Sequence, residues 1–107
     1  MFEVQNILKD LPVPFPNEVF EDILKNDKLR IERIISQGQV SPSEGWYDQD
    51  ENEWVLVLEG HAKILFDNEV VHDLQAMDYL YIPAHQKHKV LWSDPNQRTV
   101  WLAIFFS

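Results

Sequence analysis

The chain of 107 residues contains no cysteine. Disulfide bonds, thiolate metal sites and cysteine nucleophiles are therefore excluded, and the absence is typical of a protein of the reducing cytoplasm, where we expect this one to reside. Basic residues are scarce as well, since 9 Lys and Arg stand against 18 Asp and Glu, for a net charge of −9. A nucleic-acid duplex needs a basic surface, so nucleic acid is not an expected partner.

Long apolar runs are also missing. No run of about 18 apolar residues occurs, so neither a membrane-spanning helix nor a membrane partner is expected. The amino-terminal segment MFEVQNILKDLP has no basic region, so we expect no secretory signal. A Ser-His-Asp set, a P-loop and a dinucleotide-binding glycine pattern are absent too. What remains is a chain with 45 % hydrophobic residues, enough for one domain with one core.

The first 28 residues are predicted to form an arm packed on the rest of the domain. Three prolines at alternate positions exclude a helix over 1–17 and favour an extended arm: Pro12, Pro14 and Pro16. In the segment 18–25, four apolar residues have the spacing of a short helix: Val19, Phe20, Ile23 and Leu24. Only two helical turns fit there, so a strand is the competing interpretation.

From residue 29 to the end at 107 the pattern is that of a β domain. Short apolar runs are separated by turn signals, among them Gly60 and the cluster at 93–96. The expected strands cover 29–36, 53–58, 62–66, 69–74, 79–82, 87–92 and 99–106. They do not alternate with helices, which indicates an all-β sandwich or barrel.

The stretch EWVLVLEG, residues 53–60, resembles the first of two motifs of the cupin family. That motif reads Gly, five residues, His-x-His, three or four residues, Glu, six residues, Gly. The chain keeps the spacing from Glu53 to Gly60, while Tyr47 and Gln49 stand where the family has its two histidines. The resemblance covers about residues 31–104. It implies an all-β double-stranded β-helix, the jelly-roll barrel of that family.

The second cupin motif reads Gly, five residues, Pro-x-Gly, two residues, His, three residues, Asn. Pro83 and His88 match it, whereas Met77 and His85 replace its glycines and Trp92 replaces its asparagine. A non-glycine residue at positive φ costs about 1–2 kcal/mol. We therefore expect the turns at Met77 and His85 to adopt ordinary, negative φ values.

The resemblance implies that Tyr47, Gln49, Glu53 and His88 gather around one point inside the barrel. These four residues are the candidate metal ligands. A carboxylate and an imidazole suit Zn, Fe, Mn or Ni. The amide of Gln49 is a weaker donor, and Tyr47 binds a metal well only as a phenolate, whose free pKa is about 10. We therefore expect either a weakly held divalent metal or none.

The same region supplies the candidate contacts of a small-molecule ligand: Tyr47, Gln49, His85 and Trp92. His85 adds a second imidazole to the site if it faces inward, and faces solvent if its segment forms a tight turn. Simpler roles stay open for the two strongest candidates. Glu53 is equally well explained as a hydrogen-bond acceptor without metal, and His88 as a satisfied core histidine.

Three functions are consistent with these residues. The first is a metal-dependent enzyme of isomerase or oxygenase type. The second is a metal-free protein that binds a small molecule, and the third is an accessory homodimer with a vestigial site. A homodimer is expected because the last strand is apolar on both faces, and because the family often dimerises through such a sheet.

Overall fold

Eight β-strands and no helix make up the residues that the computed structural model describes, 2–42 and 44–107. The strands are β1 (Val19–Lys25), β2 (Leu29–Ser36), β3 (Asn52–Glu59), β4 (His61–Phe66), β5 (Val71–Gln75), β6 (Tyr79–Ile82), β7 (His88–Ser93) and β8 (Thr99–Phe106). The predicted all-β fold is confirmed. No helix in the described ranges is long and apolar enough to cross a membrane.

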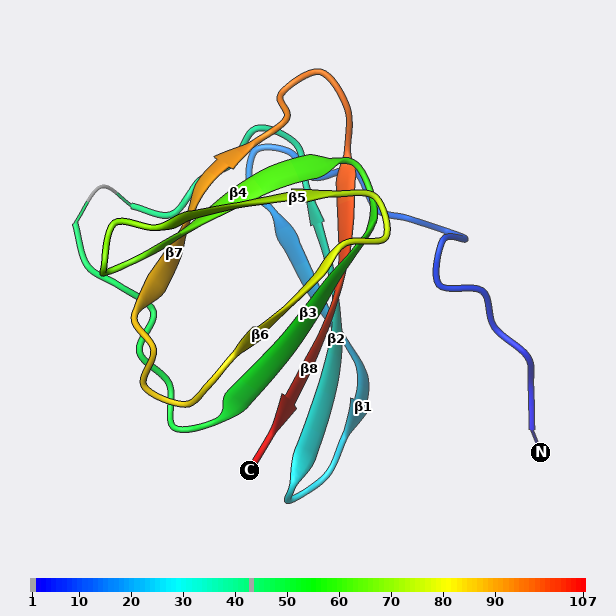
Figure 1. Ribbon diagram of the computed structural model, residues 1–107. Coiled ribbons are helices and arrows are strands. Elements are labelled where there is room, and N and C mark those ends of the chain that lie inside the picture. The colour runs from blue at the N-terminus through cyan, green and yellow to red at the C-terminus, as the bar shows by residue number, and fades with distance from the viewer. Residues whose placement is uncertain (1, 43) are drawn as a thin grey trace.

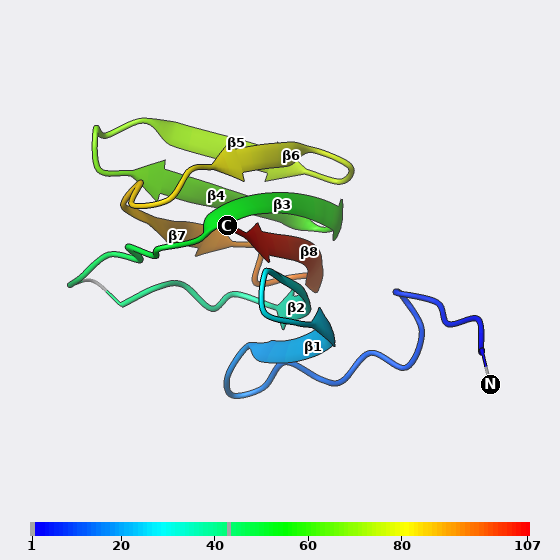
Figure 2. The same cartoon turned by 90° about the horizontal axis from the view of Figure 1, so that it is seen from below.

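The strands form two antiparallel sheets. One sheet has five strands in the order β1-β2-β8-β3-β6, and the other has three in the order β5-β4-β7. Figures 1 and 2 show the sheets wrapped around a common interior, with β4, β5 and β7 on one side and β2, β8 and β3 on the other. This arrangement is the jelly-roll barrel that the resemblance implies.

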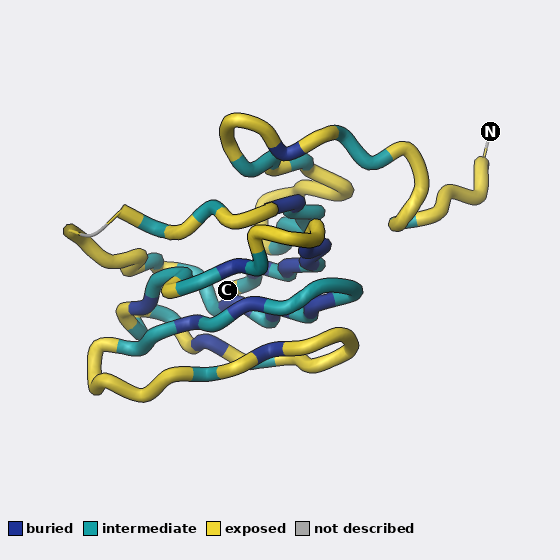
Figure 3. Tube along the Cα trace, turned by 90° about the horizontal axis from the view of Figure 1, so that it is seen from above, coloured by how far each residue is buried: buried dark blue, intermediate teal, exposed yellow. Residues whose placement is uncertain are grey.

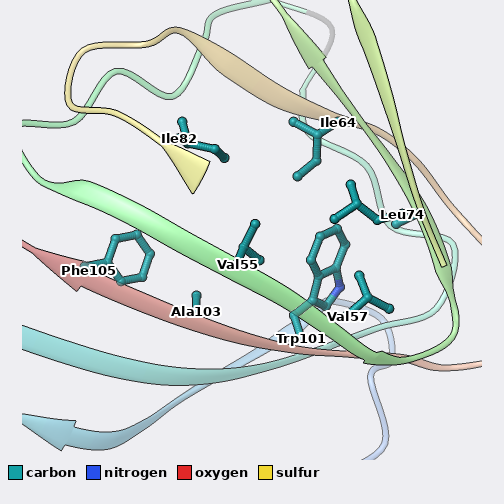
Figure 4. Close-up of a cluster of buried hydrophobic side chains, with 9 residues drawn as sticks. Val55, Val57, Ile64, Leu74, Ile82, Trp101, Ala103 and Phe105 are labelled. Carbon is teal, nitrogen blue, oxygen red and sulfur yellow. The ribbon is translucent and has the colours of Figure 1, made fainter. Parts of the chain in front are cut away.

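The core lies between the two sheets and follows the alternation of the strands. On β3, Val55 and Val57 are buried, while their neighbours on the chain point outward and are partly exposed. Figure 4 shows Ile64 and Leu74 of the smaller sheet facing Trp101 and the β3 valines of the larger one. Each fully buried Val or Ile side chain stabilises the fold by about 1.5–3 kcal/mol.

Residues 19–25 form the edge strand β1, so the helix expected there is not present. The strand pairs with β2 in an antiparallel register that runs from Val19↔Ile35 to Lys25↔Arg30, with an irregularity between Asp22 and Leu24. A helix of two turns is marginal by itself, whereas β2 satisfies a whole ladder of backbone hydrogen bonds. As a strand, the segment brings Phe20 to the wall of the interior.

The residues before β1 form an arm that runs away from the barrel (Figure 1). Arg33 of β2 holds its middle part, since Nη1 donates to the carbonyls of Ile7 (3.0 Å) and Lys9 (3.1 Å). Gln39 Nε2 donates to the carbonyls of Pro14 (2.8 Å) and Pro16 (3.2 Å). Figure 3 shows that most of the arm is exposed.

The expectation of ordinary φ values at the two replaced glycines is wrong. Met77 has a φ of 72° and His85 a φ of 65°. In both turns the strained residue donates a backbone hydrogen bond to a distant segment: Met77 to Val57 (2.6 Å) and His85 to Gln49 (2.8 Å). These bonds offset the cost of the left-handed conformation, which side chains other than glycine adopt at about 1–2 kcal/mol.

The last strand has its two apolar faces in different surroundings. Trp101, Ala103 and Phe105 belong to the core. Leu102 and Ile104 lie on the outer face of the larger sheet and are partly exposed. The outer face continues across β3 and β6, where Trp54 packs on Tyr79 at 5.3 Å between ring centroids, and Tyr81 stacks on Phe106 at 6.3 Å. Across β3, β6 and β8 the outer face is thus rich in apolar and aromatic side chains.

Candidate functional site

Three neighbouring strands bring a cation, an aromatic ring and a carboxylate into one row on the inner face of the larger sheet. The register pairs Arg30 of β2 with Phe105 of β8, and Phe105 with Glu53 of β3. Residues that pair across antiparallel strands point to the same side of the sheet. The guanidinium of Arg30 lies over the ring of Phe105, 3.9 Å from its centroid.

The segment before β3 reaches the site through a short bridge to β7. Tyr47 and His88 exchange backbone hydrogen bonds, with Tyr47 N donating to His88 O (2.9 Å) and His88 N to Tyr47 O (3.1 Å). Their rings lie 5.7 Å apart. The bridge places Tyr47, and Gln49 two residues later, beside the histidine of the second motif.

Glu53 and His88 form a buried pair. Their side chains approach to 3.5 Å between His88 Nε2 and Glu53 Oε1, and the residues are only 5 % (His88) and 8 % (Glu53) exposed. Gln49 Nε2 donates to the same Glu53 oxygen at 3.2 Å. His88 Nδ1 lies 2.8 Å from the carbonyl of Gln86, which only accepts hydrogen bonds, so Nδ1 carries a proton. Nε2 is therefore the nitrogen that gains or loses a proton toward Glu53.

The proton affinity of His88 reflects two opposing influences. Burial alone lowers the pKa of His88, but the hydrogen bond to Glu53, the Gln86 carbonyl and the charge of Glu53 together raise the pKa above its ordinary value of 6.5. The imidazolium form is thus favoured by its surroundings.

The pair opens into a cavity of about 270 Å³. Small organic ligands usually occupy cavities of about 300–1,000 Å³ with mainly apolar walls and a few polar groups, so this cavity is at the lower limit of that range and suits a small molecule. The apolar part of this wall consists of Phe20, Ile34, Val55, Ile64, Val90, Trp101 and Phe105. Its polar part consists of Glu18, Arg30, Glu32, Tyr47, Gln49, Glu53 and His88.

Four of the six candidate residues line this cavity together: Tyr47, Gln49, Glu53 and His88. His85 lies apart from them. Its side chain is 64 % exposed, and its Nδ1 lies 2.9 Å from Asp48 Oδ1. The tight turn at positive φ directs it to solvent, which decides between the two alternatives that the sequence left open.

Trp92 lies outside the cavity as well. Its ring contacts His61 edge-on at 5.0 Å and lies 5.5 Å from Lys63 Nζ. The reason is a bulge in β7, since Lys63 pairs with Trp92 but the next residue of β4 pairs with Val90. The extra residue, Leu91, reverses the alternation, so Trp92 points outward where a regular strand would turn it inward.

Several lining residues were not anticipated from the sequence. Arg30, Glu32 and Ile34 lie two positions apart along β2, so their side chains share one face of the strand. That face lines the cavity and therefore places two charged side chains on the inside. Arg30 donates to Glu32 and, at 2.9 Å, to Glu51. Glu18 begins the segment 18–25, for which the sequence left a helix and a strand open, and the pairing of β1 with β2 brings this segment to the cavity.

Two further groups in the wall have perturbed acidity. Burial raises the pKa of the Glu18 carboxyl. Burial also raises the pKa of the Tyr47 phenol, as do the charges of Glu18 and Glu53, against a smaller opposing hydrogen bond with Ser41. Tyr47 therefore remains a neutral phenol near pH 7.

The donor set does not fit a tightly held metal ion. Zn, Fe, Mn and Ni are usually held by three or more imidazole, carboxylate or thiolate groups. Here Glu53 and His88 supply two, the Gln49 amide is bonded to Glu53, and Tyr47 is held in its protonated form. Across residues 2–42 and 44–107, no group of three or more His, Cys, Asp or Glu side chains is arranged to hold a metal.

Comparison with known families and structures agrees with this geometry. The family model described as "Cupin domain" matches residues 33–105. A crystal structure from Ralstonia eutropha JMP134, described as a "putative mannose-6-phosphate isomerase", is similar with a TM-score of 0.93 and 40 % identity, over 98 % of each chain. An RmlC-like cupin from Desulfovibrio desulfuricans has a TM-score of 0.76 and 18 % identity, over 98 % of this chain and 97 % of its own. No curated protein matches the chain.

Proposed function

Because the chain belongs to the cupin family, we propose that its barrel binds a small polar organic molecule on the Glu53–His88 pair, without a resident metal. The observation that carries this proposal is the pair itself. The Nε2 and Oε1 atoms lie 3.5 Å apart at the base of an open cavity whose wall is mainly apolar. A carboxylate and an imidazole so arranged accept and donate hydrogen bonds to hydroxyl or carbonyl groups.

Each side chain around the pair has a distinct role in this proposal. Gln49 restrains the Glu53 carboxylate, and the Gln86 carbonyl fixes the ring orientation of His88. Tyr47 offers a neutral hydroxyl at the same end of the cavity. The apolar rings of Trp101 and Phe105 exclude water from the bound molecule, which strengthens these polar contacts.

A second candidate function is proton transfer on the bound molecule, as in a sugar isomerase. It is favoured by the similarity to the Ralstonia protein, which is described as a putative mannose-6-phosphate isomerase and is 40 % identical to this chain. In such a reaction Glu53 takes a proton from a carbon next to a carbonyl and returns it to the neighbouring carbon, while His88 donates to and recovers a proton from the oxygens. A positioned acid–base pair contributes about 10²–10⁴-fold in rate.

A metal-dependent isomerase or oxygenase is the alternative that the family resemblance implies. Glu53 and His88 are the side chains that would hold a divalent ion, and a ligand or water would have to supply the remaining donors. A bound ion would supply Lewis acidity or redox chemistry. We favour the metal-free interpretation because, of the four side chains that the resemblance assigns to the metal site, Glu53 and His88 alone are strong donors.

The test of ligand binding is a thermal-shift screen of the untagged protein with sugars, organic acids, amines and aromatic metabolites, since a bound ligand raises stability by mass action. Compounds that stabilise the wild type are then titrated by calorimetry against Glu53→Gln and His88→Gln. We expect at least a tenfold loss of affinity in each variant and none in His61→Gln, which alters a histidine on the outside of the barrel. No stabilising compound in a broad library would instead favour an accessory role.

We also propose that two copies associate through the outer face of the larger sheet. That face carries large apolar side chains on β3, β6 and β8, and Tyr79 is 67 % and Tyr81 50 % exposed. The same face on a second copy is its natural complement, because a two-fold axis places equivalent apolar residues against each other. A partner copy would cover surface that monomeric proteins rarely leave open.

A further inference from the structure

The charged groups that line the cavity are paired with one exception. Arg30 is engaged by two carboxylates, Glu32 and Glu51. Glu53 faces His88 and accepts from Gln49. The fifth charged group is the carboxylate of Glu18, which accepts no hydrogen bond and forms no ion pair within the described residues.

Glu18 lies in the cavity wall at the start of β1. It precedes Phe20 by two positions, and both residues line the cavity. The negative charge of Glu18 acts on the phenol of Tyr47, as does the charge of Glu53. Tyr47 therefore lies under the influence of two carboxylates, of which only Glu53 has a cationic counterpart in His88.

An unpaired, half-buried carboxylate is costly in the empty cavity. Burial raises the pKa of Glu18, which means that its charged form lacks both water and a counter-ion. A ligand that brings a positive charge to this position offsets that cost with a charge-assisted hydrogen bond. The aromatic rings of Phe20 and Trp101 in the same wall also favour a cation, whereas the ring of Phe105 is already covered by the guanidinium of Arg30.

An anionic ligand meets the opposite conditions. Glu18, Glu32 and Glu53 all line the cavity, and the whole chain has a net charge of −9. Within the described residues, the one arginine of the wall already binds two carboxylates, so a phosphate or carboxylate group would have to displace one of them. Like charges placed together weaken binding and exclude the wrong ligand.

We infer that the barrel selects a small hydroxylated amine, whose ammonium group pairs with Glu18 while a hydroxyl group bonds to Glu53 and His88. This inference rests on the proposed binding function and adds the class of ligand to it. It also gives this chain a different class of ligand from the phosphorylated sugar in the name of the Ralstonia protein.

The test is calorimetric titration of the full chain with matched sets of amine, alcohol and phosphate ester on the same carbon skeleton. Glucamine, sorbitol and sorbitol 6-phosphate form one such set, and ethanolamine, ethylene glycol and 2-hydroxyethyl phosphate form a smaller one. We expect the amine to bind at least tenfold more tightly than the alcohol and the phosphate ester to bind weakest. The replacement of the amine by the alcohol removes one charge-assisted hydrogen bond, and the loss of such a bond lowers the affinity about tenfold or more.

The variant Glu18→Gln keeps the shape of the side chain and removes its charge. We expect it to lower the affinity for the amine about tenfold and to leave the affinity for the alcohol unchanged. Asp22→Asn is the matched control, because Asp22 is an exposed carboxylate on β1, the strand that Glu18 immediately precedes. A thermal melt verifies that both variants are folded.

Two results would overturn the inference: a phosphate ester that binds more tightly than its amine, or an amine affinity that Glu18→Gln leaves unchanged. If compounds of another class bind and lose affinity in His88→Gln, the inference fails while the proposed binding function stands. If nothing binds at all, both fail.

Discussion

Replacement of Glu53 by Gln tests the coupling of the buried pair to pH. The glutamine has the volume of the glutamate and keeps an oxygen that accepts from Gln49, but it removes the negative charge that faces His88. Burial, which lowers the pKa of His88, then meets only the opposing effect of the Gln86 carbonyl. The pKa of His88 is therefore expected to fall when Glu53 is replaced.

The sign of the effect on stability follows from linkage. In the wild type the pKa of His88 lies above its ordinary value of 6.5, so the folded state binds the proton more tightly than the unfolded chain. The resulting stabilisation is fully present below about pH 6.5 and is lost as the pH rises through the raised pKa. The variant lacks this contribution, so it is expected to be most destabilised in mildly acidic solution.

The magnitude follows from the geometry. A hydrogen bond to a charged group contributes about 1.5–3 kcal/mol. The separation of 3.5 Å is longer than a normal hydrogen bond, so we expect about 1.5 kcal/mol, the lower end of that range. For a domain of this size that corresponds to roughly 6–10 °C in melting temperature.

The assay is thermal unfolding of wild type and Glu53→Gln at about pH 5.5 and about pH 8.5, with NMR titration of the imidazole Cε1–H signals. The His88 signal is identified by its loss in His88→Gln. Asp50→Asn is the control, because Asp50 is a carboxylate in the neighbouring segment with a side chain 96 % exposed. Equal destabilisation by Glu53→Gln at both pH values, or an unchanged His88 titration, would refute the reasoning.

Three further predictions concern the turns, the outer face and the cavity wall. Gly60→Ala should lower the free energy of unfolding in urea by at least about 2 kcal/mol, because φ is +103° and an added Cβ would lie 2.4 Å from Thr99 Oγ1. Gly45→Ala, at a φ of +90° in open space, should lower it by about 1 kcal/mol. Equal losses in the two variants would contradict the steric argument. If two copies associate as proposed, Ile104→Asp should give a monomer in light scattering without loss of the fold, and a wild type that is monomeric at high concentration would disprove the interface. Trp92→Ala should leave the ligand affinity within about twofold of the wild-type value, because the ring lies outside the cavity. A large loss of affinity would show that Trp92 contributes to the binding site.

Part of the site could be predicted from the family resemblance and the spacing of its motifs. In the structure, alternation with period two along β3 turns Glu53, Val55 and Val57 to the buried side. The distance from Glu53 back to Gln49 and Tyr47, together with the resemblance, placed both residues beside His88. The bridge between Tyr47 and His88 accounts for that position, because backbone hydrogen bonds join the two motifs directly.

The wrong predictions concern features that depend on contacts between separate parts of the chain, which the sequence of one strand does not reveal. The outward turn of Trp92 depends on an extra residue in β7, which is visible only from its pairing with β4. The positive φ values at Met77 and His85 depend on hydrogen bonds to Val57 and Gln49, which come from other parts of the chain.

The edge strand β1 is the undecided alternative that matters most for function. Its apolar spacing fits a helix as well as a strand, and the choice is made by its pairing with β2. That pairing completes the cavity wall with Phe20 and, just before the strand, with Glu18. The residue that sets the expected class of ligand was therefore hidden from any argument based on local periodicity.

The most direct test of the central claim compares ligand binding before and after removal of metal. The untagged protein is dialysed against a chelator, its metal content is measured by elemental analysis, and a compound identified in the screen is titrated by calorimetry. Binding on Glu53 and His88 without a resident metal predicts the same affinity in chelated and untreated protein. Loss of binding in the chelated protein, with recovery on addition of stoichiometric Zn, Mn, Fe or Ni, would contradict the account.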